Sequence, residues 1–312
     1  MILIKIQWAA MEWILEPLGA SFVQRAVLAG SMVAVVCAVV GTWVVVRGMA
    51  FLGDAMSHGL LPGIAIASLL GGNLLLGAAL SAAATAAGVS AITRNRRVSQ
   101  DTAIGLLFVA MLSLGVIIVS ASGSFAVDLT GTLFGDVLAV GMEDVVLLAV
   151  VGCLVLAVAG RFHRALAAAT FHPQKAASLG LRPRLTHAVL LGMVTVAVAA
   201  SFQVVGTLLV FGLLIAPPAA ALVWARSVGT VMALGALIGV SSVVAGLWIS
   251  WYASTAAGAT IALVAALSYF ASALCHSATR GTKPGPGALA AAAVVVPAPL
   301  PEKETRAPHH YA

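Results

Sequence analysis

Residues Val228–Trp251 read VGTVMALGALIGVSSVVAGLWISW, an apolar run of 24 residues without a charged side chain. An α-helix needs about 20 such residues to cross the hydrocarbon layer of a membrane. Similar runs recur along the chain, and within lipid only helices or closed barrels satisfy their own backbone hydrogen bonds. The run therefore predicts a transmembrane helix, and its repetition predicts an all-α integral membrane protein.

The composition of the whole chain points the same way. Of its 312 residues, 62% are hydrophobic and only 8% are charged, whereas a soluble domain usually carries about 25% charged residues. A water-soluble enzyme of this length is therefore excluded, and membrane lipid is the expected surrounding. The net charge of +6 is interpreted as an excess of Lys and Arg in cytoplasmic loops, so no nucleic-acid partner is expected.

Nine apolar runs are candidates for membrane spans. One of them, residues 145–160, is short, and the stretch at 186–224 divides around Gln203. We therefore expect an all-α polytopic membrane protein with eight or nine transmembrane helices. The runs are Phe22–Val46, Ala55–Leu70, Leu74–Ile92, Thr102–Ser120, Val145–Gly160, Thr186–Phe202, Val204–Trp224, Val228–Trp251 and Gly258–Leu274.

Basic residues predict which ends of these spans face the cytoplasm, because Lys and Arg concentrate in cytoplasmic loops. Placing all the basic loops on one side agrees with nine crossings and an external N-terminus. The loop at 121–144 would then be external, and it carries four acidic residues and no basic one. The basic residues used are Arg47, Arg94, Arg96, Arg97, Arg161, Arg164, Lys175, Arg182, Arg184, Arg226, Arg280 and Lys283.

Three regions are expected along the chain. Residues 1–20 contain tryptophans and scattered charges, which favour a short segment lying at the membrane interface. Residues 21–279 form the transmembrane domain. Residues 280–312 are rich in Pro, Gly and Ala, so a disordered cytoplasmic tail is expected there, and no role is assigned to its His309-His310 pair.

One stretch places two ionisable residues close together inside an apolar run. Asp54 and His58 are four residues apart, so on a helix they share one face. Ionisable groups in a membrane span are costly, about 2.5–3.5 kcal/mol for a central Asp, and each one suggests a function. If Arg47 marks the inner interface, His58 lies roughly 16 Å deeper, near the middle of the hydrocarbon layer. One carboxylate and one imidazole suit a divalent ion such as zinc, manganese or ferrous iron.

Two ligands are too few for a tight site, so the pair points to a dimer in which two copies supply four ligands around one ion. Plain structural roles stay open at this point. Asp54 could cap a helix or pair with Arg47, and His58 could be a core histidine. The spacing of two residues does not decide between these roles and metal binding.

The residues around this pair resemble a known family. Residues 47–63, RGMAFLGDAMSHGLLPG, are similar to the signature of the permease subunits of zinc and manganese ABC importers. The resemblance covers residues 22–274 and includes several ordered motifs. These further motifs are Asp101–Gly105, Leu133–Val140, Val205–Val210 with Pro217, and Gly258–Val264.

The resemblance implies a type II ABC importer-like permease in the cell membrane of a bacterium, with residues 21–279 as the permease domain. It implies three partners, namely a second copy of the chain, a cytoplasmic ABC ATPase dimer and an extracellular or periplasmic metal-binding protein. Asp54 and His58 are then expected to hold the transported Zn²⁺ or Mn²⁺ transiently, with iron as a third candidate. No permanently bound cofactor is expected, and ATP belongs to the partner subunit.

The basic loop at about 161–184 resembles the coupling segment that docks on the ATPase in this family. Phe171, His172, Lys175 and Gly180 are the residues expected to take part in this coupling. His172 stands where the family usually has an acidic residue, so a specific acidic contact with the ATPase is not expected at this position.

The chain is expected to be a transport subunit and not an enzyme. The sequence contains no GxxxxGK motif followed by Ser or Thr, so ATP hydrolysis requires a separate subunit. Two other transport functions are considered. A permease for a metal chelate such as a siderophore or cobalamin would need no tight ligand pair, and a proton-coupled secondary transporter would use Asp54 and His58 as a proton relay.

Overall fold

The computed structural model describes residues 16–93, 99–121, 137–171 and 182–279. Within these ranges every regular element is helical, which confirms the all-α prediction. The elements are η1 (Pro17–Gly19), α2 (Ser21–Val46), α3 (Phe51–Gly59), α4 (Leu61–Leu69), α5 (Leu74–Thr93), α6 (Gln100–Ala121), η2 (Val137–Ala139), α8 (Met142–Phe171), α10 (Pro183–Val205), α11 (Thr207–Trp224), α12 (Val228–Ala253) and α13 (Ala257–Thr279).

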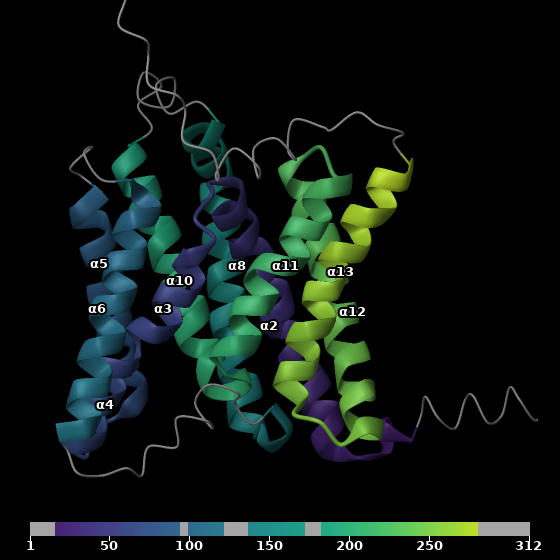
Figure 1. Cartoon of the computed structure of the whole chain (residues 1–312), viewed down its shortest axis with the longest axis horizontal. Helices are drawn as coiled ribbons and strands as arrows, with labels where there is room; N and C mark the ends of the chain where they lie inside the picture. The colour runs from purple at the N-terminus through teal and green to yellow at the C-terminus, as the bar shows by residue number, and fades with distance from the viewer. Residues whose placement is uncertain (1–15, 94–98, 122–136, 172–181, 280–312) are drawn as a thin grey trace, which may run out of the picture.

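Eight helices in the described part of the chain are long and apolar enough to cross a membrane, namely α2, α5, α6, α8, α10, α11, α12 and α13. Figure 1 shows these helices side by side along one direction, with α5 and α6 at one edge and α12 and α13 at the other. The multi-pass architecture predicted from the apolar runs is therefore confirmed.

The apolar run at residues 55–70 is not one continuous helix. It is divided between α3 and α4, of nine residues each, which meet at Leu60. Pro62 lies in the first turn of α4, and its ring nitrogen has no hydrogen to donate to the carbonyl of His58, so the helical ladder is interrupted. The carbonyl of Gly59 accepts a hydrogen bond of 2.6 Å from the hydroxyl of Ser81 on α5. A neighbouring helix thus stabilises the break one residue after His58.

Helix α8 is longer than the apolar run at 145–160 indicates, because it continues to Phe171. Residues 165–169 read ALAAA, and Ala and Leu have the strongest intrinsic preference for helix. Hydropathy declines after Gly160 while helix propensity stays high, so the helix continues beyond its apolar segment to Phe171. The first part of the expected coupling loop, residues 161–171, is consequently helical.

The long apolar stretch at 186–224 is divided at Gly206, three residues beyond the predicted position at Gln203. Gly206 has a φ of 78°, a left-handed conformation that glycine adopts without strain, and it separates α10 from α11. Proline usually bends or ends a helix, but α11 continues through both Pro217 and Pro218 to Trp224. Both prolines are buried against other helices. In such surroundings a membrane helix tolerates the carbonyl groups that its prolines leave without a donor.

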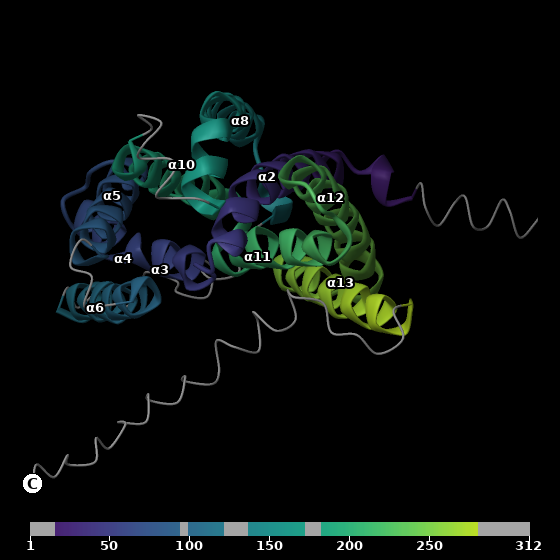
Figure 2. The ribbon, with the colours of Figure 1, turned by 90° about the horizontal axis from the view of Figure 1, so that it is seen from above.

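The described helices form two layers when the molecule is seen from above. Figure 2 shows α6, α3, α11 and α13 on one side and α5, α10, α8, α2 and α12 behind them. Helices α2 and α10 have the largest buried share of any span, and α6 and α13 have the smallest. Helix α3 packs against α5, α6, α10 and α11. The short helix that carries Asp54 and His58 is therefore central in the front layer.

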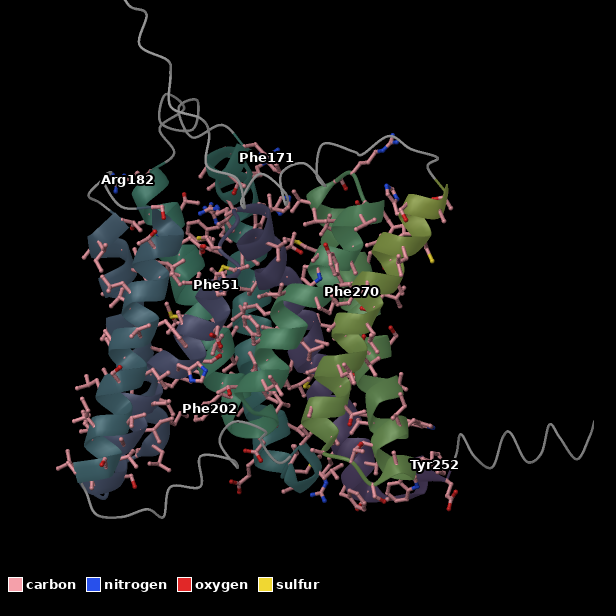
Figure 3. The ribbon with its side chains drawn as sticks, viewed as in Figure 1. Phe51, Phe171, Arg182, Phe202, Tyr252 and Phe270 are labelled. Carbon is pink, nitrogen blue, oxygen red and sulfur yellow. The ribbon has the colours of Figure 1, made fainter. Side chains whose placement is uncertain are left out.

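The two ends of the bundle differ in the residues that they carry. Phe171 and Arg182 lie at one end, and Phe202 and Tyr252 lie at the other (Figure 3). Arg47 joins the first group because its side chain contacts Thr170, the neighbour of Phe171. Two of the basic residues predicted to be cytoplasmic, Arg47 and Arg182, thus lie at this end, and we call it the cytoplasmic end after that prediction.

Candidate functional site

Asp54 and His58 lie on the one accessible stripe of α3. In this helix only Phe51, Asp54 and His58 are accessible, and all other residues are buried. The side chains of Asp54 and His58 are 32% and 19% exposed. The spacing i, i+3, i+7 places the three residues along one face of a helix. The acidic and imidazole groups therefore face away from the packed side of α3.

The two side chains approach each other as a pair of metal ligands would. His58 Nε2 lies 3.4 Å from Asp54 Oδ1. Zinc and similar ions bind such donors at about 2.1 Å, and two donors 3.4 Å apart then subtend about 108° at a shared ion. This angle is close to the tetrahedral value. The pair can therefore chelate one divalent ion without a change of backbone.

Phe108 on α6 fixes the other side of the imidazole. The ring centroids of His58 and Phe108 lie 5.2 Å apart and the rings are nearly perpendicular, at 73°. Such edge-to-face contacts are favourable because the edge of one ring meets the electron-rich face of the other. Phe108 lies near the middle of α6, so the site is well inside the bundle and away from both of its ends.

The buried face of α3 sets the orientation of the helix. Met56 is fully buried, and its sulfur accepts a hydrogen bond from the hydroxyl of Thr195 at 3.8 Å. Gly53 lies so close to Leu214 of α11 that an added Cβ would come within 2.5 Å of the leucine side chain. The thioether of Met56 is thus held toward α10, and α3 cannot rotate without losing these contacts.

Two of the plainer roles considered for Asp54, helix capping and pairing with Arg47, are not found among the described residues. Ala50 is the N-cap of α3, and no side chain caps that end. The guanidinium of Arg47 donates to Thr170 Oγ1 instead of pairing with Asp54. Asp54 and His58 contact each other, and both remain partly accessible.

One chain supplies two candidate metal donors at this position, Asp54 and His58. Within the described ranges, no group of three or more His, Cys, Asp or Glu side chains is close enough to hold a metal ion. Two protein donors leave at least half of the coordination positions of an ion to water or to other groups. A tighter site requires donors from outside the described part of one chain.

The family model for the ABC 3 transport family matches residues 20–276. The chain belongs to the ABC 3 transport family. As a member of this family it is a multi-pass transport subunit of the cell membrane, as the sequence motifs predicted.

Several curated relatives of this ABC 3 family chain are named for manganese transport. It is 36% identical over 261 residues to a protein of Halalkalibacterium halodurans named manganese transport system membrane protein MntC, covering 84% of this chain and 89% of the relative. It is also 36% identical over 251 residues to the manganese import system permease protein ScaB of Streptococcus gordonii, covering 80% of this chain and 90% of the relative.

A solved structure has the same fold as this chain. PsaBC from Streptococcus pneumoniae, solved in complex with a Fab, has a chain that is 32% identical to this one. The TM-score is 0.74, and the likeness covers 84% of this chain and 95% of the other. The fold expected from the family resemblance is therefore confirmed.

The residues expected to couple the ABC 3 chain to an ATPase are only partly described. Phe171 ends α8 at the cytoplasmic end and is 55% exposed. His172, Lys175 and Gly180 lie outside the described residues. Phe171 is thus a large exposed aromatic side chain at the point where the expected coupling segment continues.

Two residues that the sequence did not single out contact His58 and Arg47 of this family member. Phe108 touches His58 from α6, and Thr170 receives the hydrogen bond of Arg47 from α8. Each lies in an apolar or alanine-rich run with no motif of its own. No signal in a single sequence identifies them, because both contacts join segments far apart in the chain.

An apolar cavity near the site does not suit a hydrated cation. It has a volume of about 510 Å³ and lies among α4, α5 and α6. The polar side chains in its lining are those of Asn73 and Ser81, and carbon atoms form nearly all of the rest. Ser81 already donates to the carbonyl of Gly59. This cavity therefore offers a cation fewer donors than the Asp54–His58 pair does.

Proposed function

We propose that this chain is the permease subunit of an ATP-driven importer that carries a divalent transition-metal ion across the cell membrane. The observation that carries the proposal is the accessible stripe of α3, where Asp54 and His58 meet at a chelating distance of 3.4 Å inside an apolar bundle. An Asp–His pair facing lipid would be a large unexplained cost. A pathway for a cation gives the pair a function.

A second copy of the chain completes the proposed site. Two protomers facing each other through the front layer would bring two Asp54 and two His58 side chains together. These four donors match the usual number of protein ligands of a closed zinc site. The open face of α3, flanked by α6 and α11 in Figure 2, is the surface proposed to meet the partner protomer.

Manganese is the proposed cargo, with zinc as the alternative and iron as a third candidate. The names of the MntC and ScaB relatives support manganese, whereas another relative is named a probable iron transport system membrane protein. A mixed oxygen and nitrogen donor set also suits zinc and ferrous iron, so the ligands do not separate the three ions. Selectivity then rests on the number of ligands and on the delivering protein.

Two kinds of partner supply what the chain does not. A cytoplasmic ATPase dimer would bind and hydrolyse ATP, because the 312-residue sequence contains no phosphate-binding loop. An extracellular or periplasmic metal-binding protein would deliver the ion. The end of α8 at Phe171, followed by His172, Lys175 and Gly180, is the proposed docking region for the ATPase, and access alternates between two states that differ in affinity for the ion.

Uptake into proteoliposomes tests this function. The permease is reconstituted with its ATPase and its binding protein, and radiolabelled manganese is supplied with or without unlabelled zinc. We expect uptake that requires ATP inside the vesicles, that is unaffected by a pH gradient, and that zinc inhibits.

Other outcomes of this experiment would identify the rival functions. Uptake by the permease alone under a pH gradient would replace the proposal by a proton-coupled transporter. Uptake of a metal chelate with no uptake of the free ion would replace it by a chelate permease.

A further inference from the structure

Arg47 links the end of α8 to the turn that begins α3. Its Nε donates a hydrogen bond of 2.9 Å to the hydroxyl oxygen of Thr170. That hydroxyl in turn donates to the carbonyl of Leu166, at 2.6 Å. Thr170 directly precedes Phe171, the last residue of α8. A side chain at the end of α2 is thus attached to the place where the proposed docking region starts.

This attachment is partly buried. Leu166 is fully buried, and burial lowers the pKa of the Arg47 guanidinium from its ordinary value, although an arginine stays charged. One turn earlier on α2, the buried Trp43 packs against His163 of α8, with ring centroids 5.5 Å apart. Two contacts, one helical turn apart on α2 and about two turns apart on α8, therefore hold the ends of these helices together.

The turn that follows Arg47 is fixed by its own backbone hydrogen bonds. Gly48 has a φ of 68°, which permits a tight reversal. The N–H of Met49 donates to the carbonyl of Val44, and the N–H of Leu52 donates to the carbonyl of Met49, both at 3.0 Å. Met49 and Leu52 are buried. The start of α3 therefore has a fixed position relative to Arg47.

We propose that Arg47 is a positioning residue that couples the ATPase docking region to the metal-site helix. The proposal rests on the function proposed above. When the end of α8 moves with the ATPase, the hydrogen bond from Arg47 to Thr170 transmits the displacement to the Arg47–Ala50 turn. Helix α3 then moves as a unit, and Asp54 and His58 move with it.

The contact is well suited to this role because it is a single hydrogen bond. Its partner is a neutral hydroxyl, and the Nη2 atom of Arg47 is buried without a hydrogen-bond partner among the described residues. A carboxylate would bind the guanidinium through two parallel bonds and hold it in one state. One bond to a hydroxyl can break and re-form as the importer alternates between its states.

Substitutions at Thr170 test the coupling directly. Thr170→Val removes the hydroxyl but keeps the shape of the side chain, and Thr170→Ser keeps the hydroxyl. The complete importer is reconstituted, and the metal ions transported per ATP hydrolysed are counted. We expect Thr170→Val to lower this ratio at least about fivefold, within the range of usual coupling effects, while ATP hydrolysis continues. Thr170→Ser is expected to behave as wild type.

Thr93 provides a matched control. It ends α5, is partly buried, and its hydroxyl donates to the carbonyl four residues earlier, Val89, at 2.7 Å. The hydroxyl of Thr170 makes the same kind of intrahelical bond but also accepts from Arg47. Thr93→Val is therefore expected to leave the ratio of transport to hydrolysis unchanged.

Arg47→Ala and the double variant Arg47→Ala/Thr170→Val complete a double-mutant cycle. If the hydrogen bond carries the coupling, the double variant loses no more coupling than either single variant. Additive losses would overturn the proposal. So would a Thr170→Val importer that couples normally, or one whose transport and hydrolysis fall together with the amount of folded protein.

The same assay separates this proposal from the proposed function. A wild-type importer that moves no metal would contradict the proposed function itself. A wild-type importer that moves metal, with a Thr170→Val variant equal to it, would contradict only the role of Arg47.

Discussion

Metal uptake by the reconstituted importer is expected to fall at least about tenfold when Asp54 or His58 is replaced by alanine. Substituting residues that merely orient metal ligands lowers affinity by about 10–100-fold, so the loss of a ligand costs at least the lower figure. Each substitution removes two donors from the proposed homodimeric site. The double variant is expected to transport no metal above background.

The controls for this prediction separate ligand loss from misfolding. His276→Ala removes a histidine in the last turn of α13, whose ring contacts Trp224 at 5.3 Å and lies far along the chain from α3. This variant is expected to transport metal as wild type does. Asp54→Asn keeps the shape of the side chain and removes its charge, and it is expected to lower uptake as Asp54→Ala does. Normal uptake by well-assembled Asp54→Ala and His58→Ala importers would contradict the site.

Gly41→Ala is expected to destabilise the folded protein by about 1–3 kcal/mol, the usual cost of overpacking. Gly41 lies on α2, and a Cβ added there would overlap the carbonyl oxygen of Leu214 on α11. That carbonyl has no helical donor, because residue 218, four positions later, is a proline. The carbonyl of Leu214 therefore lies against Gly41, and glycine is the residue that has no Cβ to overlap it.

Thermal unfolding in detergent measures this effect, with Gly192→Ala as the matched control. Gly192 lies in the interior of α10, and an added Cβ there would meet no atom within 4 Å. Alanine favours helix over glycine by about 1 kcal/mol, so Gly192→Ala is expected to be neutral or stabilising. Equal unfolding temperatures for the two variants would show that α2 and α11 are not in close contact at Gly41.

The long helices were predictable because their signal is local. Runs such as 228–251 are apolar throughout, and every residue of such a run contributes to the same assignment. The pairing of Asp54 with His58 was predictable for the same reason, since a spacing of four residues fixes a shared helix face. Local spacing also explains why the site motif could be found without knowledge of its neighbours.

The break in the α3–α4 segment and the length of α8 were harder to predict. Pro62 alone does not end a helix in a membrane protein, since Pro217 and Pro218 lie inside α11. The difference lies in the surroundings, because Ser81 stabilises the carbonyl of Gly59 at the break. Hydropathy likewise marks where a span leaves the lipid and not where the helix of α8 ends.

Contacts between distant segments could not be predicted from one sequence. The ring of Phe108 meets His58 across 50 positions of the chain, and Thr170 meets Arg47 across 123. These pairs depend on how α6 and α8 pack against α2 and α3. The sequence therefore indicated the candidate ligands, and the structure added residues that contact His58 and Arg47.

The central claim is that the imidazole of His58 binds the transported ion. Pulsed electron paramagnetic resonance on importer loaded with Mn²⁺ measures this most directly, because a coordinated nitrogen modulates the manganese signal. A nitrogen modulation is expected in the wild-type importer and is expected to vanish in His58→Ala while it persists in His276→Ala. A wild-type spectrum without nitrogen coupling, or one that His58→Ala leaves unchanged, would contradict the claim.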